Sequence, residues 1–141
     1  LLSEKPIVLL DGAHNPSGIE ALKSAIQKFL PNKYIIAITG MLADKDVSTS
    51  VKLLDGVFDR VYTVPVHNPR AMHPAKLMQK YAKFVDDTVT FESAEHAFDM
   101  AFEQAEKTDC AVVICGSLYL AGEIRPYIIN KIKAENESAE K

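Results

Sequence analysis

Two patterns of apolar and polar positions alternate along this chain. Short, mostly apolar runs predict β-strands. Amphipathic stretches between them predict helices, because apolar residues recur there every three or four positions, as Ile19, Leu22 and Ile26 do. The predicted strands lie at residues 7–11, 34–40, 60–66, 88–91 and 111–115. Such regular alternation favours parallel strands joined by right-handed crossovers. We therefore expect an α/β fold, a Rossmann-like three-layer sandwich with a mostly parallel sheet and helices on both faces.

Capping residues and proline place the predicted helices. Asn15 suits the cap of the first helix, and Pro16 suits its first helical position. Apolar residues at helical spacing predict a second helix that reaches residue 58 and a third helix over residues 73–84. The last helix begins near residue 118, and Pro126 kinks or restarts it. We expect one domain, residues 1–133, followed by a frayed charged tail at 134–141.

Composition narrows the class of protein. The chain has 141 residues, 48% of them apolar and 25% charged, as in an ordinary globular domain. Its formal net charge of −3 argues against nucleic acid or an anionic membrane as a partner, because both select a basic face. Cys110 and Cys115 would point to opposite strand faces, which favours reduced thiols and a cytoplasmic protein. The start at Leu1, without Met, suggests a C-terminal piece of a larger protein.

Polar residues gather where the predicted strands end. The hexapeptide at residues 11–16, Asp-Gly-Ala-His-Asn-Pro, follows the first strand, and the segments 40–45, 67–70 and 116–117 follow three others. In a parallel sheet these turns share one rim, where helix N-termini add hydrogen-bond donors. The rim is therefore expected to bind an anionic or carboxylate ligand, with Asp11 available for an ammonium group.

Each of these rim residues also has a purely structural interpretation. Asp11 could hydrogen-bond the amides of its own turn, and His14 could be a packed imidazole with a backbone partner. Asn15 and Ser117 could only cap helices. Arg70 could form a surface ion pair of small energetic value.

Several familiar sites are missing from the sequence. It contains no G-x-G-x-x-G dinucleotide fingerprint and no G-x-x-x-x-G-K-[ST] phosphate loop. It also contains no G-x-S-x-G nucleophile elbow and no Cys/His cluster with metal-ligand spacing, so no metal-ligating residue is predicted.

Three segments together resemble a known family. The hexapeptide at 11–16, the stretch Gly-Met-Leu-Ala-Asp-Lys-Asp at 40–46, and Gly-Ser-Leu-Tyr-Leu-Ala-Gly-Glu at 116–123 are similar to signatures of the folylpolyglutamate and dihydrofolate synthases. These enzymes are ATP-dependent amide-bond ligases of the Mur ligase family. The first segment is fairly specific, and the other two would be weak alone.

The resemblance implies a two-domain ligase of which this chain is the C-terminal glutamate-ligase domain. Its N-terminal ATPase domain would hold the phosphate loop, Mg²⁺ and most of the folate pocket, so the fragment alone would be inactive. The implied cofactors are ATP and Mg²⁺, and the implied substrates are L-glutamate and folate or dihydropteroate. The implied reaction forms an acyl phosphate on the acceptor, which the amino group of glutamate then attacks.

The resemblance also implies roles for individual residues. Asp11 and His14 look like the catalytic pair that orients the glutamate amine, and Ser117 resembles a hydroxyl placed near glutamate. Asn15 looks like a contact near the nucleotide. Two further roles rest on rim position alone: Arg70 is expected to bind glutamate, and Lys45 to bind the nucleotide.

Other functions remain open at this point. One is a peptidoglycan-precursor ligase, whose C-terminal domain has a related turn. Another is a non-enzymatic domain that binds a nucleotide or metabolite, and a third is a purely structural module. Whether the parent enzyme acts on dihydropteroate, on folates or on both is also undecided.

Overall fold

A six-stranded sheet forms the centre of the molecule. The computed structural model describes residues 1–44 and 46–139. The strand order is β1-β2-β6-β3-β4-β5. All neighbours are parallel except β1, which pairs with β2 in the antiparallel sense. The strands are β1 (Ser3–Glu4), β2 (Ile7–Leu10), β3 (Tyr34–Thr39), β4 (Arg60–Thr63), β5 (Asp87–Thr90) and β6 (Cys110–Cys115).

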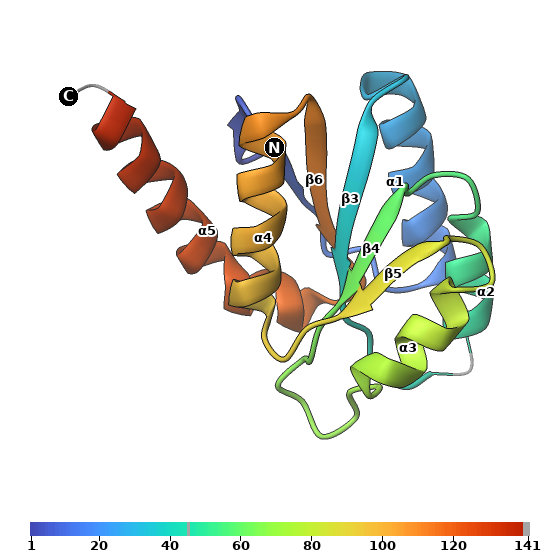
Figure 1. Ribbon diagram of the computed structural model, residues 1–141. Helices are drawn as coiled ribbons and strands as arrows, with labels where there is room; N and C mark the ends of the chain where they lie inside the picture. The colour runs from blue at the N-terminus through green and yellow to red at the C-terminus, as the bar shows by residue number, and fades with distance from the viewer. Residues whose placement is uncertain (45, 140–141) are drawn as a thin grey trace.

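Helices cover both faces of this sheet, as Figure 1 shows. Those packed in one core cluster are α1 (Pro16–Phe29), α2 (Val47–Leu53) and α3 (Pro74–Tyr81). Those packed in the other are α4 (Ala94–Lys107) and α5 (Leu118–Ala139). The predicted α/β three-layer sandwich with a mostly parallel sheet is therefore confirmed.

The two cores arise because successive strand residues point to opposite faces. Ala37 and Val113 pack with α1, α2 and α3, whereas Ile36 and Val112 pack with α4 and α5. All six residues of β6 are buried, as expected for a parallel strand covered on both sides. The register aligns the ends of neighbouring strands, so that Ile114 of β6 lies between residues of β2 and β3.

Some element boundaries differ from those expected. The two-residue strand β1 was absent from the sequence prediction. Helix α2 ends at Leu53, not near residue 58, because the chain turns at Gly56, whose φ is 79°. Val57 and Phe58 keep the helical spacing only because they pack into the same core after that turn.

The last helix is longer than expected. We expected a frayed tail from residue 134, whereas α5 continues to Ala139, with Pro126 inside it. Residues 134–139 are exposed but rich in helix-forming types such as Ala and Glu, which explains the continued helix. Residues 140 and 141 lie outside the described part of the chain.

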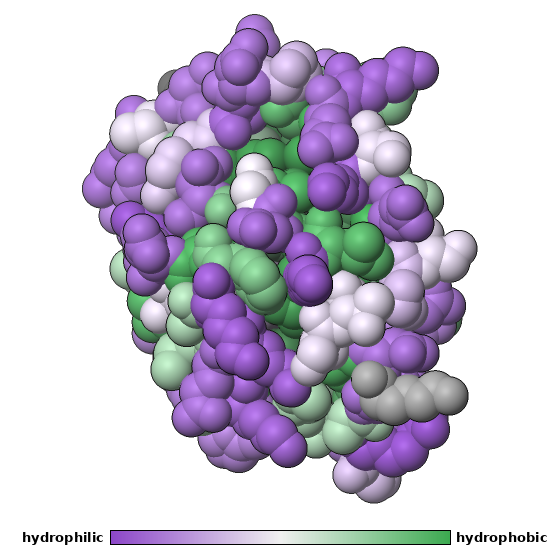
Figure 2. Space-filling model, turned by 90° about the vertical axis from the view of Figure 1, so that its right-hand side faces the viewer, coloured by the Kyte–Doolittle hydropathy of each residue, from purple (hydrophilic) through white to green (hydrophobic). Residues whose placement is uncertain are grey.

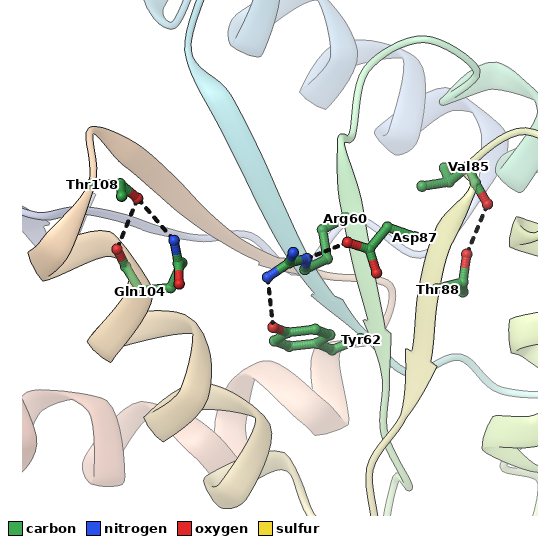
Figure 3. A network of polar contacts seen from close by, with 7 residues as sticks. All are labelled: Arg60, Tyr62, Val85, Asp87, Thr88, Gln104 and Thr108. Atoms are coloured by element: carbon green, nitrogen blue, oxygen red, sulfur yellow. Dashed lines mark hydrogen bonds and ion pairs between the residues drawn. The ribbon is translucent and has the colours of Figure 1, made fainter.

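Polar contacts join the strands at the β4–β5 side of the sheet (Figure 3). Arg60 Nε lies 2.6 Å from Asp87 Oδ2, and Arg60 Nη1 lies 3.5 Å from the hydroxyl of Tyr62. The carboxylate of Asp87 raises the pKa of the Arg60 guanidinium further above its usual range. Arg60 and Asp87 are register partners, so this contact supports the alignment of the two strands.

Both cysteines are unpaired thiols, buried on opposite faces of β6 as expected. Burial raises the pKa of the Cys115 thiol to about 12, so this thiol stays protonated at neutral pH. Among the helices of residues 1–44 and 46–139, none is both long and apolar enough to cross a membrane.

Candidate functional site

Backbone hydrogen bonds join the turns that follow β2 and β6. Asp11 N donates to Ile114 O at 2.9 Å, and Gly116 N donates to Ala13 O at 2.9 Å. Gly116 has a φ of 109°, and a Cβ there would lie 2.5 Å from Thr39 Oγ1 and 2.8 Å from Gly40 O. Only glycine suits this position, which holds the two turns against the end of β3.

The turns that follow β3 and β4 are joined in the same way. Ala43 N donates to Arg70 O at 2.6 Å, and Met72 N donates to Met41 O at 2.8 Å. An isolated antiparallel bridge between Leu42 and Ala71 completes the contact. The backbone of Arg70 is therefore fixed beside the loop after β3.

These four turns enclose a hollow of about 200 Å³ at the rim of the sheet. It brings together three of the predicted site residues, His14, Arg70 and Ser117, although they lie far apart in the sequence. Its lining comprises His14, Leu42, Ala43, Asp44, Arg70, Gly116, Ser117, Leu118 and Tyr119. Asp11 and Asn15 belong to the same rim but do not line the hollow.

His14 is the exposed member of the first turn. Its Nδ1 lies 3.0 Å from Gly12 O. A carbonyl oxygen can only accept, so Nδ1 carries the proton in this contact, and Nε2 of the neutral ring keeps its lone pair. The turn therefore holds the imidazole in the tautomer that can accept a proton at Nε2.

Ser117 is buried at the start of α5, with 2% of its surface exposed. Its Oγ accepts hydrogen bonds from Tyr119 N at 3.0 Å and Leu120 N at 3.3 Å. The hydroxyl thus caps the helix as an acceptor, and its own proton is the group it can donate to a ligand in the hollow.

Asp11 and Asn15 both hydrogen-bond within their own turn. Asp11 Oδ1 accepts from Ala13 N at 2.8 Å, and Asn15 Oδ1 accepts from Gly18 N at 2.9 Å as the cap of α1. Asp11 therefore stabilises its own turn and Asn15 caps α1, which are the structural roles considered for them above. Lys45, predicted to bind the nucleotide, lies outside the described residues.

Two lining residues with polar side chains, Asp44 and Tyr119, were not among the predicted site residues. Asp44 accepts a hydrogen bond from Asp46 N at 2.9 Å and also lines the hollow. Tyr119 is half exposed at the first turn of α5. One signal in the sequence could have identified it. Tyr119 stands two positions after Ser117, a helix-capping serine that follows a strand.

Within residues 1–44 and 46–139, no group of three or more His, Cys, Asp or Glu side chains could hold a metal ion.

Curated relatives resemble nearly the whole chain. It is 35% identical over 129 residues to the folylpolyglutamate synthase of Lacticaseibacillus casei, covering 91% of this chain and 28% of that protein. It is 30% identical over 128 residues to the dihydrofolate synthase/folylpolyglutamate synthase of Escherichia coli K12, covering 91% and 29%. The chain thus spans less than a third of the length of these relatives.

A solved structure shows the same architecture. The folylpolyglutamate synthase of Mycobacterium tuberculosis, complexed with ADP and AMPPCP, superposes with a TM-score of 0.82 at 28% identity. The match covers 89% of this chain and 30% of that one. A family model described as "Mur ligase, glutamate ligase domain" matches residues 1–118. The chain therefore belongs to the Mur ligase family, as a glutamate ligase domain.

Proposed function

We propose that this chain is the C-terminal domain of an ATP-dependent ligase that joins L-glutamate to folate or dihydropteroate. The observation that carries the proposal is the rim hollow, which unites an imidazole, a guanidinium and a buried hydroxyl from three separate turns. The similarity to synthases with this activity favours a folate-type acceptor over a muramyl peptide.

The proposed reaction has two steps. The γ-phosphoryl group of ATP is transferred to an oxygen of the acceptor carboxylate, giving an acyl phosphate. The amino group of glutamate, having lost a proton, attacks the carbonyl carbon; the carbon–oxygen bond to phosphate breaks and an amide remains. Such a reaction requires a base near the amine and groups that hold the carboxylates of glutamate.

The rim supplies these groups. His14 Nε2 accepts the proton of the glutamate ammonium, while Arg70 and the hydroxyl of Ser117 bind its carboxylates. Asp11 shapes the turn through Oδ1, and its other oxygen orients the ammonium. In this scheme Asp11 and His14 are the catalytic pair. The hollow also shields the acyl phosphate from water when a second domain closes over it.

The remaining components belong to the longer protein in this proposal. Asn15 and Lys45 contact the nucleotide, and the N-terminal ATPase domain of the same chain binds Mg²⁺ and most of ATP. Since that domain would hold the acceptor as well, we expect the 141 residues alone not to catalyse ligation.

The test is phosphate release by the intact parent protein with ATP, Mg²⁺ and L-glutamate. Dihydropteroate, tetrahydrofolate and a nucleotide-linked muramyl peptide are offered separately. Glutamate-dependent release with either pterin acceptor supports the proposal and shows which activity dominates. Release with the muramyl peptide alone would overturn it in favour of a peptidoglycan-precursor ligase. Silence from a folded, ATP-binding protein would point to a non-enzymatic domain.

A further inference from the structure

Helices α2 and α3 carry positive charge away from the rim hollow. The segments 47–54 and 71–85, which include these helices, contain four lysines and neither Asp nor Glu, although the whole chain has a formal net charge of −3. The four are Lys52, Lys76, Lys80 and Lys83. Four of the 16 Lys and Arg residues of the chain thus lie in these two segments, with no carboxylate side chain within them.

A groove of about 180 Å³ lies between these two helices. Val51 is buried at its floor and Phe84 is half-buried beside it. Lys52, Lys80 and Lys83 also line it, and Lys80 Nζ donates to Ser48 Oγ at 2.8 Å across the two helices. Figure 2 shows this side of the molecule, where apolar surface is recessed among hydrophilic side chains.

The chain segment after β3 contributes residues to both the rim hollow and the groove. Asp44 lines the rim hollow, and Ser48, four residues further along the chain, lines the groove. The backbone bond between Met72 and Met41 ties the start of the α3 segment to the same loop. A flexible ligand whose end lies in the hollow could therefore continue along α2 and α3.

We propose that this groove binds the oligo-γ-glutamyl chain of a polyglutamylated folate. Each unit of such a chain carries one free carboxylate and two methylene groups in its backbone. Carboxylates spaced along the chain complement the lysines, and the methylenes pack on Val51 and Phe84. This inference rests on the proposed function and adds a second binding site to it, for the growing product.

Binding of free penta-γ-L-glutamate to the full-length protein tests the inference directly. Calorimetry at low and physiological salt compares wild type with Lys52→Gln/Lys83→Gln. Removing two partly exposed charges should weaken binding about tenfold, and added salt should narrow the difference. The matched control is Lys133→Gln on α5, whose helix packs in the other core; it should bind like wild type.

Three outcomes would overturn the inference. Wild-type protein could fail to bind penta-γ-glutamate, the double variant could bind as tightly as wild type, or the control could lose as much affinity as the double variant. Equal effects of the double variant on inorganic tripolyphosphate would also reject it, as they would show attraction to anions in general.

Failure of the proposed function would look different. Ligation of a single glutamate to a monoglutamyl acceptor depends on the hollow and not on the groove. The double variant should therefore keep the wild-type KM and kcat with that acceptor, whereas its KM for a pentaglutamyl acceptor should rise about tenfold, in line with the calorimetry. A wild-type protein without any ligation would reject the function and leave the binding measurement valid.

Discussion

At the scale of single residues, the rim shows how structural and chemical roles coincide. Asp11, Asn15 and Ser117 each accept hydrogen bonds from backbone N–H groups of their own turns. Each keeps a further oxygen or proton that a ligand can use. His14 differs, because its ring is exposed and is held by one carbonyl contact.

Replacing His14 should separate catalysis from stability. In the intact protein, His14→Ala should lower kcat about 100-fold, because the proposed base is lost, with the melting temperature unchanged. Steady-state kinetics and calorimetry measure the two effects. His96→Ala, which removes an exposed histidine of α4, is the control and should retain activity. A wild-type kcat in His14→Ala would contradict the proposed role.

Two glycines should respond to alanine in opposite directions. Gly116→Ala should destabilise the fold by about 3 kcal/mol, because its φ of 109° and its contacts with Thr39 and Gly40 leave no room for a methyl group. Gly122→Ala should stabilise it by about 0.5–1 kcal/mol, because Gly122 lies within α5 with open space around it. Urea unfolding gives both values, and a stable Gly116→Ala would show that the rim turn can shift.

At the scale of elements, a tyrosine joins the two helices of one face. The hydroxyl of Tyr127 on α5 donates to Asp99 on α4, at 2.7 and 2.9 Å from its two oxygens. Lys131 Nζ lies 3.1 Å from Asp99 Oδ1. The hydrogen bond to Asp99 raises the pKa of Tyr127 to about 12.

The contribution of this contact should depend on pH. Because the folded state holds the phenol proton more tightly than the unfolded state, the stabilisation is complete below about pH 10 and is lost as pH rises toward 12. Tyr127→Phe should cost about 1 kcal/mol at pH 8 and less at pH 11. Unfolding in urea at both pH values measures this. Tyr34→Phe, at an exposed position of β3, should change stability by less than about 0.5 kcal/mol at either pH.

The long elements were predictable because their periodicity is strong. Ile19, Leu22 and Ile26 mark α1, and the fully apolar β6 could be read as a buried parallel strand. Strand β1 could not be predicted, because two residues that pair only through their backbone leave no apolar pattern. The end of α2 was misplaced because tertiary packing gives Phe58 a helical spacing outside a helix.

The sequence predicted which turns contribute to the candidate site, but it did not predict the hollow that they enclose. Strand alternation placed His14, Arg70 and Ser117 on one rim, and the hollow does contain all three. Strand order decides which turns are neighbours, however, and no local pattern encodes it. Only the structure therefore shows that Asp44 and Tyr119 line the hollow.

At the scale of the whole molecule, the sheet separates two apolar cores. Ile26 belongs to the core beneath α1, α2 and α3, and Ile128 belongs to the core beneath α4 and α5. Their surroundings share no side chains, so the free energy of unfolding should respond to each core independently.

Paired substitutions test this independence. Ile26→Val and Ile128→Val should each cost about 1 kcal/mol, and the double variant should cost their sum within about 0.5 kcal/mol. Chemical denaturation of the two single variants and the double variant gives the coupling energy. A coupling above about 1 kcal/mol would mean that the sheet transmits strain between its faces.

The position of β6 also has a consequence for biosynthesis. Among the strands of this sheet it is the last to be synthesised, yet it lies between β2 and β3, which are not neighbours of each other. A nascent chain that ends before residue 110 therefore holds two separate groups of strands with unpaired edges. Unpaired strand edges favour aggregation, so the nascent chain should depend most on chaperones before β6 has been synthesised. Because Gly116 and Ser117 follow β6 directly, the rim hollow forms only after every strand of this sheet has been synthesised.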